Sequence, residues 1–98
     1  MSKYDEAIDK GIALLDAKVP EWCTKMQLDH LHMADGDSCV LGQLFQREGN
    51  SSGYHLGSDK LGLKWWDTEY GFFTRDKWGP LTRRWKQRIL QHCKARGD

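Results

Sequence analysis

The chain has 98 residues, of which 39% are hydrophobic, 30% charged and 11% aromatic, and its formal net charge is +1. This length allows one hydrophobic core but not two, so we expect a single globular domain over residues 1–98. The five tryptophans are unlike the composition of a disordered chain, so we expect the chain to fold. No apolar run approaches the ~20 residues of a membrane span and the acidic, polar N-terminus is unlike a signal peptide, so we expect a cytoplasmic protein without membrane contact.

The first predicted element is an amphipathic helix that ends ahead of Pro20. Apolar side chains recur at helical spacing over residues 4–19, and Ser2 is placed to cap the N-terminus. Because the residue before a proline is disfavoured in the helical conformation, Pro20 ends this helix. Proline also suits the first turn of a helix, so a second helix of about two turns is expected to follow and to carry Trp22.

A loop and a third short helix are predicted next. Residues 28–33 alternate too briefly between apolar and polar side chains to favour a helix or a strand, and they are expected to be irregular. Residues 34–38 have loop composition, and Asp37 or Ser38 is expected to cap a helix that residues 49–53 bring to an end. The apolar face of that helix comprises Val40, Leu41, Leu44 and Phe45.

Residues 61–73 are the most ambiguous stretch, because leucines and aromatic residues dominate it. Their composition is compatible with a β-hairpin, which is one interpretation. We favour two short helices, the first broken at Gly62 and the second at Gly71, because glycine destabilises the interior of a helix.

The last predicted element is a long basic helix. Pro80 near its start and Gly97 at its end are typical of helix termini. An apolar residue at every fourth position predicts a buried stripe, which consists of Leu81, Trp85, Ile89 and Cys93. Together these elements predict a single all-α domain of four to six short helices.

The three cysteines are predicted to be free thiols, because their number is odd and they are widely spaced. Cys23, His30, His32 and Cys39 are all able to bind zinc. Their spacing matches neither the C-x₂₋₄-C nor the H-x₃₋₅-H pattern that lets neighbouring ligands reach one tetrahedral centre. We therefore expect reduced cysteines at all three positions, Cys93 included, with no metal and no other cofactor.

Other catalytic and ligand-binding motifs are incomplete. Cys39 near a predicted helix N-terminus has one feature of a reactive thiol, but its neighbours Val40 and Leu41 indicate a packed one. Asp35 and Asp37 flank a glycine as in a calcium loop, yet the later ligands and the closing glutamate are missing. No phosphate-binding glycine motif is present. The sequence therefore predicts a protein that is not an enzyme and has no small-molecule substrate.

The second part of the chain carries the excess positive charge. Residues 59–98 hold ten basic and five acidic residues, whereas residues 1–58 hold five basic and nine acidic ones. The cations around Trp85 either bind nucleic acid, or they form a solvated face while Trp85 lies in the core. Arg83 and Arg84 fall in the first turn of the last helix, where the helix dipole disfavours cations, so we expect them to face an anion in the acidic part of the chain or in a partner. The candidate nucleic-acid contacts are Arg83, Arg84, Lys86 and Arg88, continued by Lys94 and Arg96.

Five tryptophans are many for so small a domain. Trp22 and Trp85 fall on apolar stripes and are predicted to lie in the core. The other three, Trp65, Trp66 and Trp78, lie where glycines interrupt regular structure, and a small core does not cover them all. Because exposed tryptophans mark binding hot spots, residues 65–78 are predicted to form a protein-binding surface.

Several short motifs stand out as a group. Residues 15–22 read Leu-Asp-Ala-Lys-Val-Pro-Glu-Trp, residues 28–33 Leu-Asp-His-Leu-His-Met, residues 39–45 Cys-Val-Leu-Gly-Gln-Leu-Phe and residues 70–72 Tyr-Gly-Phe. Together they resemble a group of small proteins from bacteriophages that infect actinobacteria, and the resemblance covers most of residues 8–90. It implies the cytoplasm of an infected host cell and an accessory role in binding a host or phage macromolecule.

The sequence thus favours a non-enzymatic, phage-type accessory protein that binds a host or phage protein. The predicted contact residues for that partner are Trp65, Trp66 and Trp78. The alternative is a nucleic-acid-binding protein that uses the basic C-terminal helix, through Arg83, Arg84, Lys86 and Arg88.

Overall fold

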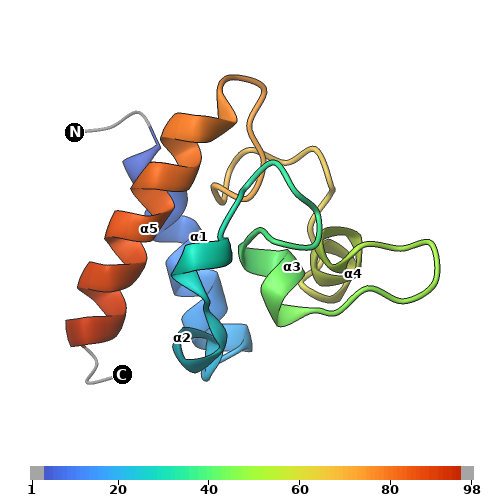
Figure 1. The fold of residues 1–98 in the computed structure, drawn as a ribbon, viewed down its shortest axis with the longest axis horizontal. Coiled ribbons are helices and arrows are strands. Elements are labelled where there is room, and N and C mark those ends of the chain that lie inside the picture. The colour runs from blue at the N-terminus through green and yellow to red at the C-terminus, as the bar shows by residue number, and fades with distance from the viewer. Residues whose placement is uncertain (1–3, 96–98) are drawn as a thin grey trace.

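The computed structural model describes residues 4–95 as an all-α fold. The helices are α1 (Asp5–Lys18), α2 (Trp22–Lys25), α3 (Val40–Leu44), α4 (Gly53–Lys60) and α5 (Trp78–Ala95), with one 3₁₀ turn at Leu28–His30 (Figure 1). Among the described residues there is no strand, only an isolated antiparallel bridge between Glu48 and Ser51. The predicted fold class is confirmed. None of the described helices has both the length and the apolar character that crossing a membrane requires.

Helices α1 and α5 lie side by side and run in the same direction along one side of the molecule (Figure 1). The apolar stripe of α5 faces inward, since Leu81 and Trp85 are fully buried and Ile89 is 3% exposed. The buried face of α1 meets it, and the ring of Phe72 stacks on Trp85 with the centroids 5.5 Å apart. The burial predicted for this stripe is therefore confirmed.

The observed ends of the first two helices agree only in part with the ends predicted from the sequence. Helix α1 begins after Tyr4, without a hydrogen bond from a capping side chain, and the predicted cap Ser2 lies outside the described residues, as does Gly97. It ends before Pro20, as predicted. Helix α2 is a single turn rather than two, because Met26 already has an extended backbone. Its first residue, Trp22, is fully buried, as expected.

The prediction that Asp37 or Ser38 caps the third helix is wrong. The cap of α3 is Cys39, whose sulfur accepts the Gly42 N–H at 3.3 Å. Asp37 has other partners, since its carboxylate accepts the Gly53 N–H and two N–H bonds from Arg47. These hydrogen bonds, first those from Arg47 and then that from Gly53, lower the pKa of Asp37 and keep its carboxylate charged.

The residues that join α4 to α5, positions 61–77, contain no helix and no strand, and we call them the aromatic segment. The two short helices predicted for residues 61–73 are both absent, since α4 already ends at Lys60 and no helix follows it before α5. Gly71 has a φ of 76°, which other residues rarely adopt. Side chains also compete with helical hydrogen bonds here, because Asp67 accepts the Glu69 N–H and Thr74 accepts the Asp76 N–H. The segment therefore folds as successive turns.

The prediction of three free thiols is wrong for two of the cysteines. Cys23 of α2 and Cys93 of α5 form a disulfide, with their Cα atoms 5.7 Å apart. An odd number of cysteines allows one pair and one free thiol, and the helical stripe of α5 carries Cys93 to the end of the core where α2 docks. Cys39 alone is free, as predicted. The cysteines therefore no longer support a reducing cytoplasm, and that location stays a prediction.

Candidate binding surface

Two of the three tryptophans predicted to be exposed are the most exposed aromatic side chains described. Trp65 is 50% and Trp66 is 42% exposed, and their rings meet edge to face with centroids 5.4 Å apart. Trp78, the first residue of α5, is partly buried and packs against Phe73 at 5.5 Å. The structure therefore gathers the predicted tryptophans at one place, although they differ in exposure.

Contacts from other parts of the chain hold the exposed rings in place. The Trp65 ring also packs against the rings of Phe73 and of His55 in α4, with centroids 5.8 and 6.4 Å apart. The Tyr54 hydroxyl donates a hydrogen bond to the Trp65 carbonyl. Burial raises the pKa of Tyr54 to about 12, so the phenol keeps its proton and remains a donor at neutral pH. Sequence reasoning missed Tyr54 and His55, since nothing in the chain pairs α4 with the aromatic segment.

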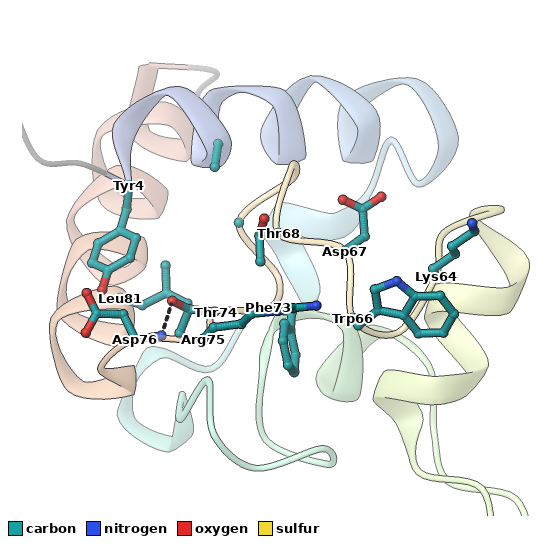
Figure 2. Close-up of a pocket in the computed structure, with 12 residues that line it drawn as sticks. Tyr4, Lys64, Trp66, Asp67, Thr68, Phe73, Thr74, Arg75, Asp76 and Leu81 are labelled. Atoms are coloured by element: carbon teal, nitrogen blue, oxygen red, sulfur yellow. Dashed lines mark hydrogen bonds between the residues drawn. The ribbon is translucent and has the colours of Figure 1, made fainter.

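A groove of about 860 Å³ runs from the start of α1 across the aromatic segment (Figure 2). Figure 2 places Tyr4 at one end of it and Trp66 at the other, with Phe73 between them. Both signs of charge line the groove, and the Lys64 ammonium lies 5.6 Å from the centre of the Trp66 ring. The full lining is Tyr4, Ala7, Lys64, Trp66, Asp67, Thr68, Gly71, Phe73, Thr74, Arg75, Asp76 and Leu81.

The basic side chains of α5 divide into two groups. Arg84 and Arg88 turn toward α1, where Arg84 holds the buried Asp5 with two hydrogen bonds, of 2.5 and 2.9 Å, and Arg88 pairs with Asp9. Arg83 is exposed and Lys86 is partly buried, and neither forms an ion pair within residues 4–95. Arg84 thus finds the expected anion in the acidic first helix. Arg83 has no such anion within residues 4–95, and an anion for it in a partner stays a prediction.

This division weakens the nucleic-acid interpretation of the last helix. Two of its four candidate contacts, Arg84 and Arg88, already neutralise carboxylates within the molecule. Trp85 is fully buried and is not available to stack on a base. Lys94 remains exposed, and Arg96 lies outside the described residues.

The residues weighed as a zinc site are not brought together. Cys23 is in the disulfide, Cys39 is buried, and His30 and His32 are exposed. In the part of the chain that the structure describes, no three His, Cys, Asp or Glu side chains are grouped as a metal site requires. Asp35 and Asp37 serve the loop itself, since Asp35 accepts the Asp37 N–H at 2.9 Å.

Cys39 is predicted to resist alkylation in the native protein. It is 1% exposed, and burial raises the pKa of its thiol to about 11. At pH 8 only about one thiol in a thousand is then ionised, so iodoacetamide should react about a hundredfold more slowly than with the denatured chain. Without reductant, denatured protein should show one titratable thiol, and with reductant all three. Three reactive thiols in native, unreduced protein would contradict both the burial and the disulfide.

No protein-family model matches the chain, and the comparisons with curated proteins and with solved structures found no match. The resemblance to phage proteins accordingly remains a prediction.

Proposed function

We propose that the protein is a non-enzymatic accessory protein that binds a protein partner through the groove and the exposed indoles beside it. The observation that carries this proposal is the adjacent pair Trp65 and Trp66, both far more exposed than the tryptophans of the core. The host or phage origin of the partner, and the cytoplasm of an infected cell as the setting, are what the phage resemblance adds.

The geometry supports binding to a protein more than binding to a nucleic acid. Large, rigid rings lose little conformational freedom on binding, and here Tyr54 and Phe73 already hold Trp65 in place. The groove combines the apolar faces of Trp66 and Phe73 with flanking charges of both signs, which is the usual composition of an interface core and its rim. A partner that presents an apolar side chain between charges of both signs fits this lining.

The proposal predicts that Trp66→Ala abolishes partner capture while the fold remains intact. Truncation of a hot-spot tryptophan costs at least ~2 kcal/mol, so affinity should fall about thirtyfold or more. Tagged protein is used to capture a stoichiometric partner from a lysate of the producing cell, and binding of that partner is then titrated with purified components. The matched control is Leu90→Ala, because Leu90 is 59% exposed but lies on α5, away from the groove lining. Equal capture by both variants would contradict the proposal.

A salt titration distinguishes the nucleic-acid alternative. If only Arg83 and Lys86 of the four candidates are free to neutralise phosphates, the slope of log affinity against log salt on duplex DNA should be about −1.8, or roughly twelvefold between 50 and 200 mM salt. Capture that nuclease treatment removes, together with sub-micromolar DNA binding that follows this slope, would replace the protein-binding proposal.

A further inference from the structure

A second, smaller pocket of about 200 Å³ lies on the aromatic segment, beside the groove. Phe73 is the one lining residue that the pocket and the groove share. Five of the eight lining residues carry an aromatic or imidazole ring. The lining consists of Met33, Ala34, Gly36, Tyr54, His55, Trp65, Phe73 and Trp78.

Neighbouring rings of the lining are steeply inclined to one another, and two of the pairs meet nearly at right angles. Trp65 is inclined by 87° to Phe73, and Trp78 by 84°, with ring centroids 5.8 and 5.5 Å apart. Tyr54 and His55 add two rings from α4, themselves inclined by 71°. Met33 is 3% exposed and is the buried, apolar member of the lining.

Hydrogen bonds between distant parts of the chain hold these walls in position. The Tyr54 hydroxyl donates to the Trp65 carbonyl, which ties α4 to the aromatic segment. The Tyr54 N–H donates to the Gly36 carbonyl at 2.8 Å, and the Met33 N–H donates to the Thr82 hydroxyl at 3.0 Å. The pocket is thus formed before any ligand binds, and little ordering is needed on binding.

The chemistry of the lining selects one kind of ligand. Aromatic rings attract a cation through their negative faces, and five of the eight lining residues carry a ring. A lysine or guanidinium group brings N–H donors that need acceptors, and no carboxylate or amide side chain lines the pocket. A quaternary ammonium group has no such donors. Since a cavity of about 150 Å³ in another protein holds benzene, the volume here has room for four methyl-sized groups around a nitrogen. We propose that this pocket binds a trimethylammonium group.

The experiment compares ligands that differ in charge but not in shape. Tetramethylammonium and choline are titrated against 3,3-dimethyl-1-butanol, the neutral analogue of choline, and the indole N–H signals are followed by NMR. We expect both cations to bind at least about tenfold more tightly than the alcohol, since cation–π attraction is lost with the charge. The signals of Trp65 and Trp78 should move. Those of Trp22 and Trp85, whose N–H groups donate to Asp16 and to the Gly71 carbonyl, should not.

Two neighbouring residues provide matched variants. Trp65→Leu removes one wall and should weaken tetramethylammonium binding at least about tenfold. Trp66→Leu changes the neighbouring exposed indole, which does not line the pocket, and should leave binding within about twofold. Binding of the alcohol as tightly as choline, cation binding unaffected by Trp65→Leu, or no saturable binding in the millimolar range would each overturn the proposal.

A further arm identifies the source of the group. Choline is compared with a short peptide that contains trimethyllysine, and the tighter ligand indicates whether the natural group is a free small molecule or a modified protein side chain. The titrations involve no partner protein, so their failure leaves the proposed protein binding in place. Conversely, if no partner protein were captured, the proposed trimethylammonium site would be unaffected, because its titrations use the purified protein alone.

Discussion

Removing the Cys23–Cys93 disulfide is expected to lower the free energy of unfolding by about 4 kcal/mol. The bridge joins positions 70 residues apart and restricts the unfolded chain, and loop-closure entropy for a loop of this size gives that magnitude. For a domain of ordinary stability, ~5–15 kcal/mol, this is a large share. Thermal melting of the double variant Cys23→Ser/Cys93→Ser should show a midpoint lowered by roughly 15–30 °C.

Reductant provides the control. Dithiothreitol should bring the melting temperature of the wild-type protein down to that of the double variant, and should not affect the variant itself. Cys39→Ala should respond to reductant as the wild type does, because Cys39 takes no part in the bridge. A wild-type melting curve that is the same with and without reductant would show that the two cysteines are not joined in solution.

Trp85→Ala is expected to lower the free energy of unfolding by ~3–5 kcal/mol, as truncation of a large aromatic residue in a core does. Trp85 is fully buried and stacks on Phe72, and its indole N–H donates to the Gly71 carbonyl at 2.6 Å. The variant therefore loses packing area and leaves a buried carbonyl without its donor. Urea unfolding of the wild type and the variant, followed by circular dichroism, measures the difference.

The matched control for this prediction is Trp66→Ala, which makes the same change at a residue that is 42% exposed. Its free energy of unfolding should stay within about 0.5 kcal/mol of the wild type. Unchanged stability of Trp85→Ala would mean that the indole is exposed among the cations of α5. The nucleic-acid function would then be the better interpretation of that helix.

Sequence reasoning succeeded where local periodicity decides the structure. The apolar stripes of α1 and α5 recur at helical spacing over several turns, and Pro20 ends the first of these helices as expected. It failed in the aromatic segment, where apolar composition indicated a helix. There the φ of Gly71 and the short-range hydrogen bonds of Asp67 and Thr74 favour turns. The apolar composition of the segment alone does not show that turns are favoured over a helix there.

The features of the candidate site that depend on contacts between residues far apart in the chain could not be predicted from the sequence. The exposure of Trp65 and Trp66 was predictable, because a small core does not cover five indoles. The smaller pocket that Trp65 lines was not predictable, since Tyr54 and His55 reach it from α4, outside the aromatic segment. The Cys23–Cys93 pair also joins residues far apart in the chain, and the count of cysteines alone suggested free thiols.

The pairing of α1 with α5 has a consequence for how the protein is made. Asp5 and Asp9 meet Arg84 and Arg88 across 79 positions of sequence, and Cys23 meets Cys93 across 70. During synthesis, α1 leaves the ribosome long before α5 exists, and its apolar face is not fully covered until the later helix emerges. Domains generally fold as units during synthesis, and the core of this domain is completed only when α5, its last helix, has been translated. The nascent chain is thus open to chaperones and to aggregation over most of that interval, and α5 completes its folding.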